Sequence, residues 1–224
     1  MPRGRHLARI KVKALDAAAA EKYWLDWDAK DLLRAPAEFP KLTSPALFGN
    51  RRPLEVEIGS GSGEALVSLA KQDPGINFLG IEISTRAAAY ATALAAEAEL
   101  GNLRILRANF KLLGPLLVAG SWRRVYLHFP DPLHKRSDRK RSLFTPEFLD
   151  AMACTLELGG ELSVASDKPA FFFVMLELAE GDGRFEKVHA ERYVEGLETP
   201  VKSRFQRFWE RKGISPLRFV LRRK

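Results

Sequence analysis

The chain has 224 residues, of which 46% are hydrophobic and 29% are charged, a balance typical of a soluble globular protein with one large α/β domain or two small ones. Its single cysteine, Cys154, excludes an intramolecular disulfide and a cysteine-based metal site, and its four histidines lack the spacing of zinc ligands. The net charge of +8 and the pI of about 9.7 favour a nucleic acid or another polyanion as partner.

No apolar run reaches the roughly 18 residues of a membrane span, and the N-terminus lacks the apolar core of a signal peptide. The sequence also contains no internal repeat. We therefore expect no membrane association, no bound metal and a location in the cytoplasm.

Residues 1–46 are expected to form a basic arm and a lead-in to the main domain. The arm, residues 1–13, carries five Lys and Arg side chains and no acid, so it suits either contact with nucleic acid or a solubilising tail. The lead-in combines a short Ala-rich helix, the aromatic residues around Trp24 and a Pro-rich loop, which together are expected to cover the sheet or a site. Residues 47–224 are expected to form a single domain.

From Pro53 onwards, strands and helices alternate. Strands are predicted at residues 54–58, 77–82, 103–108, 124–128 and 161–166, with closing antiparallel strands at 185–189 and 217–221. Helices are predicted at residues 64–72, 84–100, 110–117, 144–158 and 169–179, with Gly159-Gly160 ending the fourth. This alternation indicates an α/β fold with a doubly wound, mostly parallel seven-stranded sheet and an antiparallel C-terminal strand.

A glycine turn, residues 59–63, follows the first strand, and Glu82 lies at the end of the second. A strand, a glycine turn and a helix followed by such an acid are typical of sites for adenosine-containing cofactors, because the glycines admit the ligand and the acid accepts from ribose hydroxyls. The spacing G-x-G-x-G departs from the dinucleotide fingerprint, and Glu57 could hold an ammonium group, so S-adenosylmethionine is favoured over NAD. A glycine turn without a ligand is the alternative.

Asn109 follows the third strand. Its side-chain amide could both donate to and accept from an adenine edge, or its oxygen could cap the next helix. The sequence leaves both roles open.

The most informative segment is Pro130-Asp131-Pro132, which follows an apolar strand and precedes five basic residues between positions 135 and 141. Proline fixes its own φ and restricts the preceding residue, so Asp131 is expected to be held rigidly at the carboxyl end of a strand, where α/β sheets bind ligands. A fixed acid beside a basic surface suggests chemistry on a polyanion. A Pro-rich turn with a solvated charge run is the alternative.

The C-terminal stretch, residues 211–224, alternates apolar and basic residues over its predicted strand. This pattern predicts an edge strand with a basic outer face. Such a face favours RNA contact, and protection of an exposed edge against aggregation is the alternative.

Taken together, these segments resemble the tRNA (guanine-N7-)-methyltransferases, a family of class I S-adenosylmethionine-dependent enzymes with a Rossmann-like fold. The resemblance runs from Leu47-Phe48-Gly49-Asn50 to the C-terminus and includes residues 56–63, 78–83, 102–104 and 165–167. Its most specific part is Phe129-Pro130-Asp131-Pro132 followed by Lys135 and Lys140-Arg141. The resemblance implies methyl transfer from S-adenosylmethionine to N7 of a guanosine in the variable loop of tRNA.

The resemblance also implies roles for individual residues. The cofactor-binding residues would be Glu57, Gly59, Gly61, Glu82 and Asn109. The substrate-binding residues would be Lys135, Asp167 and, where the family has a Thr-Lys-Phe-Glu signature seven residues before a glycine, Ser203, Arg204 and Gln206. Asp131 would be the catalytic carboxylate, which favours positive charge as it develops on the base.

The chain departs from the family pattern at a few positions. Leu133 stands where the family has Trp, Ser137-Asp138 stand where it has Arg-His, and Asn109 and Gln206 stand where it usually has acids. Two other functions therefore stay open: methylation of another RNA or a small molecule, and RNA binding without catalysis on the same fold. The sequence does not decide between a monomer and a homodimer.

Overall fold

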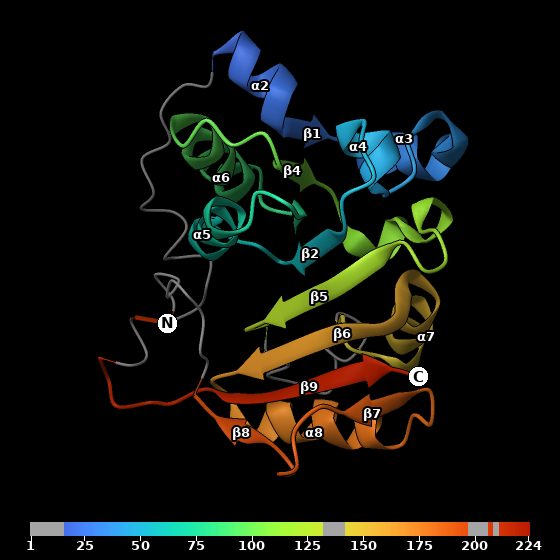
Figure 1. Ribbon diagram of the computed structural model, residues 1–224, viewed down its shortest axis with the longest axis vertical. Helices are drawn as coiled ribbons and strands as arrows, with labels where there is room; N and C mark the ends of the chain where they lie inside the picture. Colours follow the sequence, from blue (N-terminus) through green and yellow to red (C-terminus); the bar gives the residue numbers. More distant parts are fainter. Residues whose placement is uncertain (1–15, 132–141, 197–205, 208–210) are drawn as a thin grey trace.

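The computed structural model describes residues 16–131, 142–196, 206–207 and 211–224. Within them, nine strands form one sheet in the order β1-β4-β3-β2-β5-β6-β9-β7, and β8 pairs with β9 (Figure 1). The strands are β1 (Trp24–Asp26), β2 (Leu54–Ile58), β3 (Asn77–Glu82), β4 (Leu103–Arg107), β5 (Trp122–His128), β6 (Leu156–Ser166), β7 (Phe185–Lys187), β8 (Val194–Glu195) and β9 (Leu217–Arg223). The α-helices are α2 (Ala17–Tyr23), α3 (Ala29–Arg34), α4 (Ser44–Phe48), α5 (Glu64–Gln72), α6 (Thr85–Glu97), α7 (Pro146–Thr155) and α8 (Pro169–Glu180), and the short 3-10 helices are η1 (Pro36–Glu38), η2 (Phe110–Leu112) and η3 (Gly114–Leu116).

The predicted α/β fold with a mostly parallel sheet is confirmed. Neighbouring strands from β1 to β6 are parallel, whereas β9 runs antiparallel to β6, β7 and β8. The seven predicted strands are present, and in the described part of the chain the short strands β1 and β8 add to them. The bounds of β2, β3 and α5 agree with the sequence prediction residue for residue.

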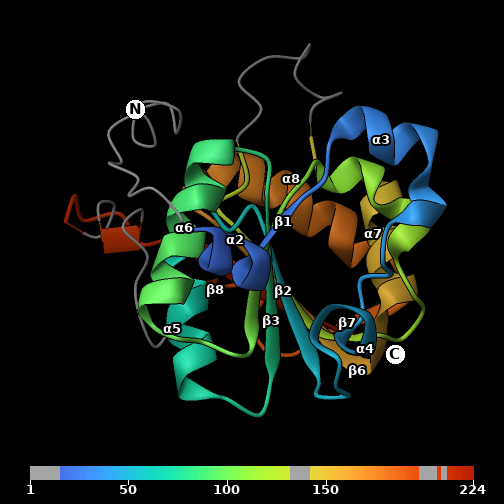
Figure 2. The same ribbon diagram turned by 90° about the horizontal axis from the view of Figure 1, so that it is seen from above.

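Helices cover both faces of the sheet, as a doubly wound fold requires. α5 and α6 lie on one side of β2 and β3, and α3 and α7 lie on the other (Figure 2). Side chains alternate along each strand, so Val125 and Leu127 of β5 enter the core with α7 and α8, whereas Arg124, Tyr126 and His128 point to the opposite face. The same sheet therefore presents an apolar face to α7 and α8 and a polar face beyond the reach of α5 and α6.

The lead-in takes part in the core. β1 pairs with β4, Trp27 donates its backbone N–H to Arg107 O at 3.2 Å, and the Arg107 side chain pairs with Asp26. Buried side chains of residues 27–47 join the main apolar cluster. The three-residue strand was too short to be predicted from the sequence. The predicted basic arm, residues 1–13, lies outside the described residues, and the division of the chain at residue 46 stays a prediction.

The prediction that the C-terminal strand lies at an edge of the sheet is wrong. β9 pairs with β6 from Leu217 to Arg222, and its other side pairs with β8 and β7. Alternating apolar and basic residues fit any strand with one apolar and one polar face, so they do not distinguish an edge strand from an inner one. The inner position depends on β7 and β8, which are only three and two residues long.

The prediction that Gly159-Gly160 ends a helix is also wrong. α7 ends at Thr155, β6 begins at Leu156, and the glycines lie in a bulge between the pairs Trp122–Leu156 and Arg124–Glu161. A Cβ atom on Gly160 would lie 2.9 Å from Glu157 O and 3.0 Å from Arg123 O, both of them backbone atoms. The glycine thus permits close approach of two strands, which its place in the sequence could not reveal.

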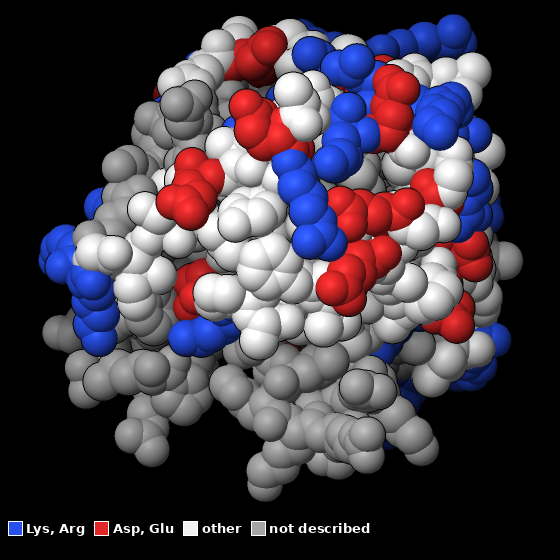
Figure 3. Space-filling model, turned by 90° about the horizontal axis from the view of Figure 1, so that it is seen from below, with Lys and Arg blue, Asp and Glu red and all other residues white. Residues whose placement is uncertain are grey.

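The lower face of the molecule, formed around α8 and β7, carries basic and acidic side chains next to one another (Figure 3). Arg192 lies 2.9 Å from Glu180, and Arg184 lies 2.7 Å from Asp150 and 2.6 Å from Asp182. Positive charge on this face is therefore matched by carboxylates. In the part of the chain that the structure covers, no helix has the length and apolar character needed to cross a membrane.

The bulge yields a test of this packing. Gly160→Ala should lower the free energy of unfolding by about 1–3 kcal/mol, because the new methyl group meets backbone oxygens that cannot move aside without distorting both strands. Chemical denaturation measures the change. Gly101→Ala is the matched control, because nothing lies within 4 Å of a Cβ atom there, and an equal loss in both variants would contradict the explanation.

Candidate functional site

Most of the predicted site residues gather at one edge of the sheet. β4, β3, β2, β5 and β6 are parallel neighbours, so their carboxyl ends meet there. The predicted residues within or just beyond these strand ends are Glu57, Gly59 and Gly61 at β2, Glu82 at β3, Asn109 at β4, Asp131 at β5 and Asp167 at β6. Lys135, Ser203 and Arg204 lie outside the described residues. Gln206 is described and is 1% exposed.

The glycine turn is held tightly against the middle of α6 and the end of β3. The backbone N–H groups of Gly59 and Ser60 donate to Ile81 O at 2.8 and 3.2 Å. Gly63 has a φ of 75°, and a Cβ atom on it would lie 2.6 Å from the Cβ atom of Ala91 in α6. A side chain at Gly63 would therefore be strained in its backbone and would also clash with the helix.

Glu82 fixes this turn through its carboxylate. Its Oε2 accepts from Gly61 N–H at 2.8 Å, and its Oε1 accepts from Ser84 N–H at 2.8 Å. The side chain is 8% exposed, and each carboxylate oxygen can accept a second hydrogen bond. Glu82 can thus hold the turn and the start of α6 while it accepts from two hydroxyl groups of a ligand.

Ile83 completes this part of the site and was missed in the sequence. It follows Glu82 directly and is 65% exposed, which is unusual for a large apolar side chain beside a buried carboxylate. It offers an apolar surface to a flat ring. Its position directly after the strand-end acid is the signal that could have identified it.

Asn109 lies beside Glu82, because Ala108 donates its backbone N–H to Glu82 O at 3.1 Å. The Asn109 side-chain oxygen accepts from Lys111 N–H at 3.1 Å and caps η2. The capping role is confirmed, and contact with an adenine edge stays a prediction.

Glu57 adds a second carboxylate to the same face of the sheet. It pairs in register with Gly80, which lies two residues before Glu82, and with Tyr126 of β5. Glu57 and Glu82 are both buried, so their charges are weakly screened. The electrostatics at this edge therefore favour a cationic ligand beside the glycine turn.

The end of β5 is shaped by Phe129, whose φ of 55° lies in the left-handed region. Its backbone N–H donates to Ala165 O at 2.7 Å, and its ring packs against Ala165. This conformation costs a non-glycine residue roughly 1–2 kcal/mol, and such strain often marks a functional position. It directs Pro130 and Asp131 out of the sheet, and Asp131 is exposed.

Asp167 emerges next to this segment, directly after β6. His128 and Ala165 are register partners, so Asp131 and Asp167 leave the sheet from adjacent strands. Asp167 Oδ2 lies 3.4 Å from Lys168 Nζ, and the aspartate side chain is 6% exposed. The two predicted acids thus differ in solvent access, with Asp131 exposed and Asp167 shielded.

His128 supports the same strand end without contributing charge. Burial, and secondarily the positive charge of Arg218, lowers its pKa from 6.5 to about 3. Its Nε2 lies 3.0 Å from Ser163 Oγ on the neighbouring strand. The imidazole is therefore neutral at physiological pH. Among the described residues, no cluster of three His, Cys, Asp or Glu side chains could hold a metal ion.

Comparison with known proteins identifies the relatives of this chain. A family model described as "Putative methyltransferase" matches residues 51–216. The tRNA (guanine-N(7)-)-methyltransferase of Rubrobacter xylanophilus is 42% identical over 97% of both chains, and that of Chloroherpeton thalassium is 36% identical over 99% of this chain and 98% of its own. Among solved structures, TrmN from Thermus thermophilus has a TM-score of 0.55 at 19% identity, covering 88% of this chain and 48% of that chain, which supports the fold.

Replacement of Glu82 by Gln tests the structural half of its role. The new NH₂ group cannot accept from a backbone N–H, so Glu82→Gln should lower the free energy of unfolding by about 1–3 kcal/mol without any ligand present. Denaturant titration of the ligand-free protein measures this. Glu21→Gln on the exposed side of α2 is the control and should be neutral; equal stability of both variants would show that Glu82 does not hold the turn.

His128 makes the stability of the protein depend on pH. Its folded-state pKa of about 3 lies below the ordinary value of 6.5, so the unfolded chain takes up a proton first and stability falls as pH decreases from 6.5 towards 3. His128→Gln should therefore lose less stability than the unaltered protein between about pH 7.5 and about pH 4.5. Thermal unfolding at both pH values measures this, and parallel losses would contradict the assignment.

Proposed function

The chain belongs to the tRNA (guanine-N(7)-)-methyltransferase family, and from that premise we propose that it transfers the methyl group of S-adenosylmethionine to N7 of a guanosine in the variable loop of tRNA. The observation that carries the proposal is the meeting of two groups of residues at one edge of the sheet. The first is the glycine turn with Glu57 and Glu82, and the second is the pair Asp131 and Asp167.

The residues around the glycine turn fit the proposed cofactor. Glu82 has capacity for two ribose hydroxyls beyond the two backbone N–H groups that it already accepts. Ile83 offers an apolar surface to the adenine ring, and Asn109 lies beside it. Glu57 is placed to attract the ammonium group, and the backbone of Gly59 and Gly61 admits the ligand. When bound, the cofactor supplies an electrophilic methyl group on a sulfonium centre.

The chemistry requires little proton transfer from the protein. Guanine N7 carries an in-plane lone pair and no proton, so its attack on the methyl group needs no general base. The site has to align N7, the methyl carbon and the sulfur and to exclude water. The buried carboxylates Glu57 and Glu82 support the placing of the cationic sulfonium cofactor at this edge.

Asp131 is the proposed catalytic residue. The methylated base becomes cationic, and a carboxylate fixed at its edge favours that charge as it develops. The same carboxylate can accept from guanine N1–H and N2–H. The strained Phe129 and the adjacent proline support this role, because they fix the direction in which Asp131 leaves β5. Asp167 is the second acid of the substrate side.

The remaining predicted residues belong to the tRNA side of the proposal. Lys135, Ser203, Arg204 and Gln206 would hold the substrate, with the basic residues on neighbouring phosphates. We further propose that residues 47–224 form the methyltransferase domain, preceded by the lead-in and basic arm of residues 1–46, and that the protein acts on tRNA in the cytoplasm as a monomer or homodimer.

A methylation assay tests the proposal. Unmodified tRNA is incubated with the protein and S-adenosylmethionine labelled in its methyl group, then digested to nucleosides and separated. Label is expected in 7-methylguanosine. Label on another base or on a small molecule would contradict the proposal and indicate a methyltransferase with a different substrate. Binding of tRNA without any label would indicate a non-catalytic RNA-binding protein.

Asp131→Asn isolates the catalytic step. It should reduce kcat by roughly 10²–10³-fold, because the developing positive charge loses its counter-charge, while the Kd of S-adenosylmethionine stays unchanged. Single-turnover kinetics and calorimetry measure the two quantities. Asp31→Asn on exposed α3 is the control and should leave both unchanged. A loss of cofactor affinity in Asp131→Asn would contradict the assignment, because it would show that Asp131 contacts the cofactor and not the guanine.

A further inference from the structure

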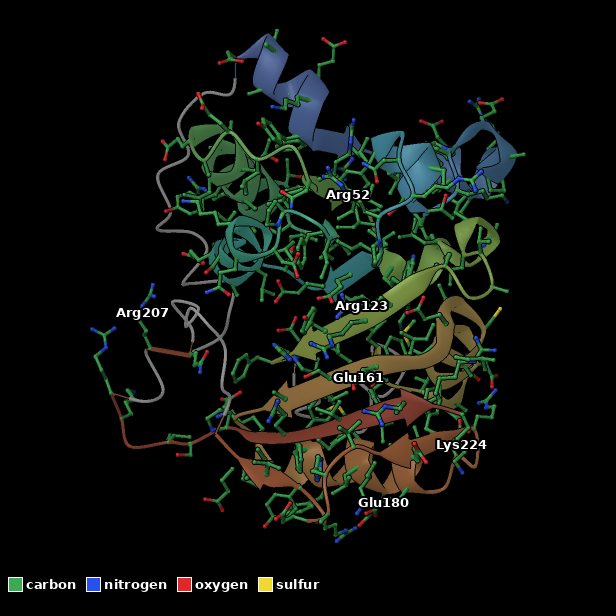
Figure 4. All side chains as sticks on the ribbon, viewed as in Figure 1. Arg52, Arg123, Glu161, Glu180, Arg207 and Lys224 are labelled. Atoms are coloured by element: carbon green, nitrogen blue, oxygen red, sulfur yellow. The ribbon has the colours of Figure 1, made fainter. Side chains whose placement is uncertain are left out.

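The polar face of the sheet carries a row of alternating charges across five strands. Register pairs connect Glu55 of β2 to Arg124 of β5, Glu161 of β6, Arg222 of β9 and Glu186 of β7. Arg124 pairs with Glu161, and Arg222 lies 3.0 Å from the same carboxylate. Figure 4 labels Glu161 in the middle of the sheet, with Arg123 on the neighbouring strand. Each arginine of this row faces a carboxylate on an adjacent strand.

A second row on the same face lies at the carboxyl edge of β5 and β6, next to the proposed substrate site. It runs from His128 through Ala165 to Arg218 of β9 and Val194 of β8. The only group in this row with a full charge is Arg218, because His128 is neutral. His128 and Arg218 both pair with Ala165, so their side chains lie on the same face of the sheet. The charge of Arg218 accordingly contributes, after burial, to the lowered pKa of His128.

Arg218 has no partner of its own within the described residues. Its Nε is buried and makes no hydrogen bond there, and no carboxylate of the described part pairs with its guanidinium. A partly buried cation that no carboxylate balances costs free energy. The neighbouring arginines show that this chain can supply carboxylates to the same face of the sheet, yet none of the described carboxylates pairs with Arg218 at the edge where the substrate is proposed to bind.

We propose that Arg218 binds a backbone phosphate of the tRNA beside the guanosine that is methylated. The guanidinium fork matches a phosphate with two parallel hydrogen bonds. The inference rests on the proposed function and extends it to a residue that the sequence did not single out.

The position of Arg218 favours the tRNA over the cofactor as the source of the anion. Strands lie about 4.8 Å apart, so β9 is roughly 14 Å from β2, which carries the glycine turn, but adjacent to β6, which ends at Asp167. The carboxylate of the cofactor would lie near the glycine turn. Arg218 therefore belongs to the substrate side of the edge.

The other basic residues of β9 have internal partners. Arg222 contacts Glu161, and Arg223 donates to the backbone oxygens of Cys154 and Leu156. The sequence favoured RNA contact over edge protection for the basic residues of this strand. The proposal assigns RNA contact to Arg218 and a structural role to the other two.

Arg218→Met tests the proposal, because it removes the charge and keeps an apolar stem of similar length. The Kd for tRNA should rise roughly tenfold or more, and the slope of log Kd against log salt concentration should fall by about one. The melting temperature without tRNA should be no lower than that of the unaltered protein, and the Kd of S-adenosylmethionine should stay the same. Filter binding over a salt series, thermal unfolding and calorimetry provide these readouts.

Arg222→Met is the matched control, on the same strand and face but beside Glu161, and it should leave the tRNA affinity unchanged. Arg218→Lys keeps the charge without the planar fork and should lose less affinity than Arg218→Met; it replaces the methionine variant if that protein does not fold. Unchanged tRNA affinity in the Arg218 variants, or loss of cofactor affinity instead, overturns the proposal. Because tRNA binding is measured without methyl transfer, an inactive but tRNA-binding protein would refute the proposed function and leave this inference standing.

Discussion

The parallel pairing of β2 with β3 on one side and β5 on the other is the constraint on which the whole site depends. It brings the end of β2 beside Glu82 and beside the strand that leads to Asp131, although these segments are far apart in the sequence. A shift of one residue in either pairing would turn Glu57 into the apolar core and break the contact between Glu82 and the glycine turn. The proposed cofactor side and the proposed substrate side of the site therefore depend on the same strand pairing.

The two faces of the sheet differ in polarity and in what they contribute to the structure. One face is apolar and packs against α7 and α8, so it supplies most of the hydrophobic stabilisation. The other face packs against α5 and α6 over β3 and β4 with a second apolar cluster. Beyond these helices it carries charged residues in rows, where ion pairs between neighbouring strands offset part of the cost of partial burial. The polar face reaches the carboxyl edge of the strands, so the substrate side continues a surface that already accommodates charge. This continuity explains how a cation can lie at the edge without disrupting the fold.

Much of the fold, and the meeting of the glycine turn with Glu82 in the candidate site, could be predicted because the signals are local. The apolar run of β2, the glycine turn and the strand-end acid Glu82 are contiguous patterns, and the structure places them as expected. The predictions failed where the outcome depends on distant partners: the inner position of β9 requires β7 and β8, and the bulge at Gly160 requires the backbone of β5. Ile83 and Arg218 were missed for the same reason, since exposure and lack of a partner are properties of the folded chain.

The inner position of β9 has a consequence for the order of folding. β6 and β7 precede β9 in the chain, yet they can join the same sheet only after residues 217–223 lie between them. Until then, β6 presents a long edge with unpaired backbone groups, and an intermediate with such an edge is prone to join another copy. The strand that completes the edge proposed to bind RNA is thus also the one that protects the folding chain from aggregation.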